Sequence, residues 1–191
     1  RRGCAGALID LGLAAKVAAA REGFDGRWEN AARVELDSVG AGHPGIPADH
    51  AEAGRLAFSM FRNNVRSWNK ENQSPVSEAD LAGDALLHER LTAIDPSIGW
   101  LSEETADAPE RLTRDLIWIV DPIDGTRSFV AGREDWAICT ALVAQGRPIA
   151  GVVELPATGE PFAAVKGGGA TRNGAPISAA RRARLEQAQV A

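Results

Sequence analysis

Two aspartates stand three positions apart in the segment LIWIVDPIDGT, which covers residues 116–126. They follow the apolar run from Leu116 to Val120, which is typical of a buried strand. Pro122 has no backbone N–H and is expected to end the ladder of this strand. Asp121 and Asp124 should then lie in the turn that leaves the strand, close enough to share an ion.

The residues around these aspartates add further ligand groups. The carbonyl of Ile123 is free to turn toward a bound ion, and Gly125 and Thr126 are expected to begin a helical turn whose N–H groups receive a phosphate. Carboxylates and a carbonyl are oxygen ligands of the kind that Mg²⁺ takes, and phosphate commonly completes its coordination. The segment therefore predicts a Mg²⁺ site that a phosphate completes.

Two more acidic groups occur upstream. Glu103 and Glu104 follow another apolar run in WLSEET, and Asp80 begins a helix in SPVSEAD. Each has an ordinary interpretation by itself: Asp80 is the third position of a capping box, the glutamates form a solvated loop, and Asp-Pro-x-Asp-Gly is a turn. Their occurrence together, in this order, favours a common acidic site.

Two helices are expected to position these residues. The apolar periodicity predicts a helix over residues 49–66, with Asp49 and Glu52 as its capping box. Ser77 is expected to cap a second helix that ends before Asp95, because a residue that precedes a proline is disfavoured in a helix.

Short strands follow the helices. They are predicted at Ile98–Leu101, Leu116–Val120, Trp136–Val143, Pro148–Leu155 and Phe162–Val165. Two helices followed by a meander of strands predict an α+β fold, with the helices packed on one face of a mainly antiparallel sheet.

Composition limits the class of protein. The chain has 191 residues, of which 45% are hydrophobic and 25% charged, and its net charge is −5. These values indicate a globular protein without a nucleic-acid or membrane partner.

Cys4 and Cys139 match no metal spacing, so a reducing cytoplasm is expected. Asp10 and Lys16 interrupt the apolar start, which argues against a signal peptide. The three histidines are interpreted as surface or helix residues: His43, His50 and His88.

The motifs SPVSEAD, WLSEET and WIVDPIDGTRSF, with GVVELPATGEPFAAVKGGGATRNGAPI after them, resemble the inositol monophosphatase-like, Mg²⁺-dependent and lithium-sensitive phosphatases. The resemblance covers about residues 49–178 and implies the fold of that family's N-terminal domain. It implies a metal site for two or three Mg²⁺ ions. Glu103, Asp121 and the Ile123 carbonyl would hold one ion, and Asp121 would bridge to a second ion held by Asp124.

The resemblance also implies roles in catalysis. Thr126, hydrogen-bonded to Asp80, would position and deprotonate the attacking water together with Glu103. The amides of Gly125 and Thr126 would hold the phosphate. Lys70 occupies a place where family members often carry a lysine, and Glu104 is either an accessory partner of the site or an exposed residue.

The chain departs from the family pattern at both ends. Residues 1–48 match nothing in the family and are interpreted as an extension or linker. Family members carry a C-terminal α/β domain whose Trp-Asp motif completes the second metal site, and residues 179–191 are interpreted as the start of the connection to it. We expect the chain by itself to be inactive.

The detailed sequence of two motifs favours one substrate. GWLSEETADAPERL and DPIDGTRSFVAGREDW look more like the bacterial 3′(2′),5′-bisphosphate nucleotidases than like inositol monophosphatases proper. The expected substrate is the small metabolite adenosine 3′,5′-bisphosphate, with inositol 1-phosphate and histidinol phosphate as alternatives. A non-catalytic fragment is an alternative of another class. The family resemblance also suggests a homodimer.

Overall fold

The structure is a computed structural model that describes residues 46–71 and 73–179. The predictions for residues 1–45 and 180–191, including those for Cys4 and His43, lie outside the described residues. Residues 46–48 of the expected extension form the first residues of a helix.

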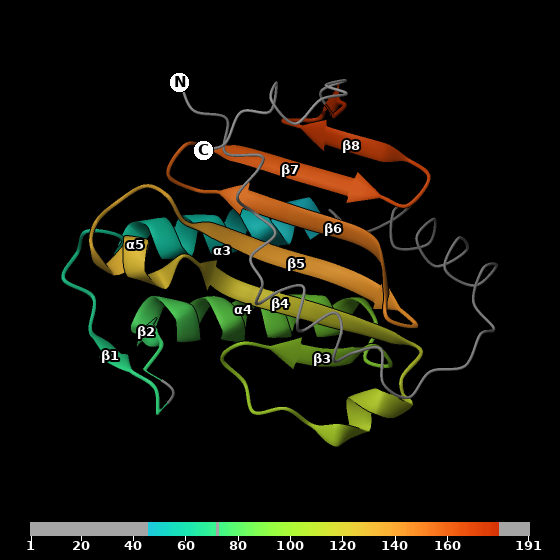
Figure 1. Cartoon of the computed structure of the whole chain (residues 1–191), viewed down its shortest axis with the longest axis horizontal. Helices are drawn as coiled ribbons and strands as arrows, with labels where there is room; N and C mark the ends of the chain where they lie inside the picture. Colours follow the sequence, from blue (N-terminus) through green and yellow to red (C-terminus); the bar gives the residue numbers. More distant parts are fainter. Residues whose placement is uncertain (1–45, 72, 180–191) are drawn as a thin grey trace, which may run out of the picture.

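The architecture is a sheet with helices against one face, as the sequence predicts (Figure 1). Seven strands form the sheet in sequence order, and only the first pair, β3 and β4, is parallel. The strands are β3 (Gly99–Ser102), β4 (Leu116–Asp124), β5 (Ala137–Ala144), β6 (Arg147–Leu155), β7 (Glu160–Val165), β8 (Gly169–Arg172) and β9 (Ala175–Ile177). The sequence did not predict β8 and β9. The α+β class and the mainly antiparallel sheet are confirmed.

Two long helices, α3 (Ile46–Met60) and α4 (Glu78–Ile94), lie against the same face of the sheet (Figure 1). The start of α4 is confirmed: Ser77 is its N-cap, and Ser77 and Asp80 form a reciprocal capping box. Its end is confirmed at Ile94, with Asp95 as C-cap in an extended conformation. None of the helices in the described residues is long and apolar enough to cross a membrane.

The prediction for the first helix was wrong in its bounds and its cap. The helix begins at Ile46 and ends at Met60, so Asp49 lies inside the first turns. Glu52 forms an ion pair with Arg90 of α4, at 2.9 Å, in place of a capping contact. The residues that look like a capping box therefore lie inside the helix, and Glu52 forms the ion pair that links α3 to α4.

Alternating residues of the central strands face opposite sides. Trp118, Val120, Ile138 and Leu142 pack with the helices, whereas the residues between them form a second buried cluster on the other face. The second cluster consists of Leu101, Ile117, Ile119, Ala141 and Val143. The wholly apolar run in β4 is explained by this burial on both faces.

Several short elements gather at one end of the sheet. The parallel strands β3 and β4 both end there, and the five-residue helix α5 (Thr126–Val130) follows β4 (Figure 1). The hairpin of β1 (Ser67–Asn69) and β2 (Pro75–Ser77), expected as a loop, leads into α4 at the same end. A 3₁₀ helix, Pro109–Thr113, connects β3 to β4. All the acidic motifs therefore meet at one end of the sheet.

Candidate active site

The tip of β4 carries the paired aspartates. The ladder with β5 continues to a pair between Asp124 and Ala137, with an irregularity between Asp121 and Asp124. The prediction that Pro122 ends the strand was therefore wrong: the missing N–H is accommodated in a β-bulge, where an unpaired residue is tolerated. The two aspartates belong to the last residues of the strand and not to a turn beyond it.

Gly125 makes the sharp change from β4 to α5. Its φ is 91°, in the left-handed region, and a Cβ atom there would lie 2.9 Å from the carbonyl oxygen of Asp135. Only glycine combines this conformation with so close an approach. Within the first turn of α5, the N–H of Ser128 donates to the carbonyl of Gly125 at 2.8 Å. The N–H groups of Gly125 and Thr126 come before this first internal bond, and N–H groups at that place in a helix can bind a ligand.

Thr126 joins this turn to α4. Its hydroxyl oxygen lies 3.0 Å from Oδ1 of Asp80 and 3.0 Å from the carbonyl oxygen of Ile123. The other carboxylate oxygen of Asp80, Oδ2, accepts from the backbone N–H of Ser77 at 2.8 Å. Asp80 therefore caps the helix with one oxygen and faces Thr126 with the other. Burial raises the pKa of Asp80, and the hydrogen bonds from Ser77 and Thr126 oppose this rise.

Glu103 lies beside the tip of β4. Ser102, the last residue of β3, pairs with Val120, and the N–H of Glu103 donates to the carbonyl of Val120 at 3.3 Å. Because the strands are parallel and Ser102 pairs with Val120, Glu103, which follows β3, lies at a position next to Asp121 of β4.

Lys70 and Glu104 form an ion pair next to Glu103. The Lys70 Nζ lies 2.8 Å from Oε1 of Glu104 and donates to the carbonyl of Glu103 at 3.2 Å. The side chain of Glu104 is only 4% exposed, so the interpretation of Glu104 as an exposed residue was wrong. Burial raises the pKa of Glu104, and Lys70 acts against this rise.

Sequence reasoning missed two residues of α4 at this site. Asp84, one turn after Asp80 and buried, accepts hydrogen bonds from the hydroxyls of Ser102 and Thr105. Gly83 lies against Pro122, where a Cβ atom would come 3.3 Å from the proline ring. The signal for Asp84 was its spacing: Asp80, Asp84, Leu87 and Leu91 share one buried helical face.

The oxygen donors fit a hard cation in their chemistry. Asp121, Asp124 and Glu103 supply carboxylates at adjoining strand ends, and Ile123 supplies a carbonyl. As the side chains are placed, no group of three acidic, histidine or cysteine residues in the described part of the chain closes around a metal position. Mg²⁺ keeps several water ligands and needs few ligands from the protein, so this open set is compatible with it.

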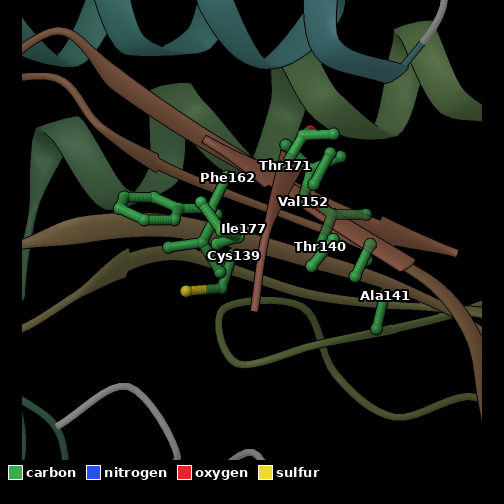
Figure 2. Close-up of a pocket in the computed structure, with 12 residues that line it drawn as sticks. Cys139, Thr140, Ala141, Val152, Phe162, Thr171 and Ile177 are labelled. Carbon is green, nitrogen blue, oxygen red and sulfur yellow. The ribbon is translucent and has the colours of Figure 1, made fainter. Parts of the chain in front are cut away.

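A separate pocket of about 230 Å³ lies on the sheet and is lined by residues of the five strands from β5 to β9 (Figure 2). Its lining is apolar and includes Cys139, Val152, Phe162 and Ile177. It contains no acid or base and does not include the residues of the acidic strand ends. We therefore place the candidate active site at the strand ends.

The part of the chain that carries the acidic site matches a known protein family. The model of the inositol monophosphatase family matches residues 47–191. The chain belongs to this family. The fold agrees with this assignment. The extragenic suppressor protein suhB from Bartonella henselae superposes on the chain with a TM-score of 0.68. It is 28% identical in sequence, and the superposition covers 79% of this chain and 57% of the suhB chain.

Curated relatives of this inositol monophosphatase family member have different named substrates. A histidinol-phosphatase from Chlorobaculum parvum is 37% identical over 127 residues, which are 66% of this chain and 48% of the relative. A 3′(2′),5′-bisphosphate nucleotidase CysQ from Aggregatibacter actinomycetemcomitans is 36% identical over 124 residues, 64% of this chain and 46% of the relative. The chain thus spans about half the length of these relatives.

Proposed function

We propose that this chain carries the metal- and phosphate-binding part of a Mg²⁺-dependent phosphomonoesterase that acts on a small phosphorylated metabolite. The observation that carries the proposal is the Asp80–Thr126 hydrogen bond at 3.0 Å, formed where the acidic ends of β3 and β4 meet. Family membership and the names of the relatives, which are phosphatases and a nucleotidase, support it.

The acidic residues would hold the metal. Glu103, Asp121 and the Ile123 carbonyl would bind one Mg²⁺, and Asp121 and Asp124 a second. When bound, Mg²⁺ supplies Lewis acidity, which lowers the pKa of a bound water and offsets the charge of the phosphate. The ion pair of Lys70 with Glu104 would hold the chain around Glu103 in place.

The protein groups would orient the reacting water. A Thr126 hydroxyl that donates to Asp80 keeps its lone pairs for a hydrogen bond from water, and Glu103 supplies a second acceptor for the water protons. The N–H groups of Gly125 and Thr126 would bind the phosphate oxygens. Attack of the water oxygen on phosphorus breaks the bond to the ester oxygen, which leaves as an alcohol after taking up a proton.

Substrate preference is the first test. We propose adenosine 3′,5′-bisphosphate as the substrate, because the sequence of residues 99–112 and 121–136 resembles that of the nucleotidases. Comparison of kcat/KM for this compound, inositol 1-phosphate and histidinol phosphate measures the discrimination. Preference for either of the last two would reverse the ranking and leave the phosphatase proposal intact.

The length of the relatives motivates the second test. We propose that a C-terminal domain, of about 80–100 residues as is usual for small domains, completes the second metal site and the substrate pocket. Phosphate release with titrated Mg²⁺, with and without lithium, should be absent for the 191 residues and present when such a domain is joined. Lithium-sensitive turnover by the 191 residues alone would show that they suffice.

An Asp121→Asn variant of the active form tests the metal ligands. It keeps the shape and removes the charge, so turnover should fall about a hundredfold or more, since even partners of metal ligands are worth 10–100-fold. Near-normal turnover would overturn the assignment. A Mg²⁺-dependent rate in neither form, with any of the three substrates, would favour a non-catalytic protein.

A further inference from the structure

Two aspartates of α4 reach two different segments at the end of the sheet. Asp80 and Asp84 lie one helical turn apart and are 1% and 8% exposed. Asp80 contacts Thr126, which follows β4, and Asp84 contacts Ser102 and Thr105, which flank Glu103 after β3. Since α4 lies against β4 (Figure 1) and Asp84 also contacts Ser102 at the end of β3, one helix contacts the chain at the acidic ends of both strands.

Asp84 accepts hydrogen bonds from residues on both sides of Glu103 in the sequence. Its Oδ1 accepts from the Ser102 hydroxyl, and its Oδ2 accepts from the Thr105 hydroxyl. The Ser102 hydroxyl oxygen also accepts from the N–H of Glu104, at 3.2 Å. Ser102 and Thr105 are thereby bonded directly to one buried carboxylate, and residue 104 is bonded to it through Ser102. The side chain of Glu103 remains 36% exposed.

Close packing of α4 on β4 makes this contact possible. Gly83 lies between the two aspartates in sequence and faces Pro122 of the bulge. A carboxylate that accepts two hydroxyl hydrogen bonds in a buried position is held more firmly than an exposed one, because both bonds are charge-assisted. The backbone of residues 102–105 is therefore fixed relative to α4, and so to Thr126 as well.

We propose that Asp84 is a positioning residue, whose carboxylate fixes the turn after β3 so that Glu103 stays beside Asp121 as a ligand for a divalent cation. The inference rests on the proposed function, in which Glu103 binds the metal. Asp84 itself contacts neither metal nor substrate in this arrangement. Its loss should weaken metal binding by misplacing Glu103.

The test uses Mn²⁺ as a paramagnetic probe of the ¹⁵N-labelled chain. In the wild type, titrated Mn²⁺ should broaden the amide signals of Glu103, Asp121 and Asp124 before others. In Asp84→Asn, the same broadening should need about tenfold more Mn²⁺, the lower end of what partners of metal ligands contribute. Thr105→Val, at an exposed position, is a second variant that keeps volume and removes one of the two bonds to Asp84.

Matched controls come from the far part of the same helix and its C-cap. Asp95→Asn makes the same acid-to-amide change at the C-cap, and Thr92→Val removes a hydroxyl that donates to the carbonyl of His88. Both should leave the Mn²⁺ titration unchanged. Urea unfolding of all four variants separates the effects, because a merely structural Asp84 would lower stability without changing the Mn²⁺ affinity of the folded protein.

The outcomes distinguish this inference from the proposed function. If the wild type binds Mn²⁺ at the strand ends and both Asp84→Asn and Thr105→Val bind it equally well, the role of Asp84 is refuted and the metal site stands. If the wild type shows no broadening at Glu103 or Asp121, the proposed metal site is refuted, and the role of Asp84 with it.

Discussion

The Thr126 hydroxyl lies 3.0 Å from Oδ1 of Asp80, although 46 positions of sequence separate the two residues. The contact joins the first turn of α4 to the first residue of α5. It coexists with the capping of α4, because Asp80 uses Oδ2 for Ser77 and Oδ1 for Thr126. The structural and the catalytic interpretations of Asp80 are therefore compatible with each other.

This pair gives the first prediction. Thr126→Val keeps the volume and removes the hydroxyl, so kcat of the active form should fall about a hundredfold, the lower range for a lost acid–base contribution. Thr126→Ser keeps the hydroxyl and should retain most of kcat. Steady-state phosphate release measures both, and an active Val variant with unchanged kcat would remove Thr126 from the mechanism.

The turn at Gly125 gives the second prediction. Gly125→Ala places a Cβ atom 2.9 Å from the Asp135 carbonyl oxygen at a φ of 91°. Gly159→Ala is a matched control, with a φ of 66° and nothing within 4 Å of the added atom. Both variants carry the cost of the left-handed conformation, about 1–2 kcal/mol. Only Gly125→Ala adds a steric clash, so it should lose more free energy of unfolding in urea; equal losses would contradict the close approach.

His50 gives a prediction on acid stability. It is a helix residue, as expected, but its side chain is fully buried, and neither ring nitrogen has a hydrogen-bond partner within residues 46–71 and 73–179. Burial lowers the pKa of His50 to about 3. Between about pH 6.5 and pH 3, the unfolded chain therefore binds a proton at this histidine that the folded chain does not bind. The free energy of unfolding decreases as the pH is lowered through that window.

From pH 7 to pH 5 this single group should cost about 2 kcal/mol. His50→Leu should remove that share of the acid sensitivity, measured as the difference in unfolding free energy between the two pH values. His88→Leu, at an exposed position of α4, is the control. An unchanged pH dependence in His50→Leu would show that burial does not lower the pKa of His50 in the folded state.

Glu154 gives a prediction of opposite sign. It lies in β6 beneath Gly54 of α3, it is 9% exposed, and its Oε2 has no hydrogen-bond partner in the described part of the chain. Burial raises the pKa of Glu154, and Arg55 acts against this rise. The folded protein therefore binds the proton more firmly than the unfolded chain, and stability falls as pH rises from the ordinary value of 4.5 through the raised pKa.

Glu154→Gln should stabilise the protein at pH 7, by about 1–2 kcal/mol if most of the cost of the unsatisfied group is removed. The gain should shrink as the pH is lowered toward 4.5. Thermal unfolding at several pH values measures it, with the exposed Glu110→Gln as control. A gain that is constant with pH would point to packing and not to ionisation.

The sequence by itself determined the features that depend on neighbouring residues. Ser77 and Asp80 cap α4 because a capping box needs only four consecutive residues, and the proline after Asp95 ends the helix for an equally local reason. The apolar run of β4 and the acidic motif at its tip were also readable from the chain, and together with WLSEET they indicated the family.

The tertiary structure decided which polar groups are buried and what they contact. Asp84 shares a helical face with Asp80, Leu87 and Leu91, and this spacing is visible in the sequence, but packing on the sheet decides that the face is buried. His50 is likewise buried by the packing of its helix on the sheet. The bulge at Pro122 likewise depends on β5, because a strand can continue past a proline only when its partner accommodates the missing bond. Burial and pairing are properties of distant segments, and the fold alone brings those segments together.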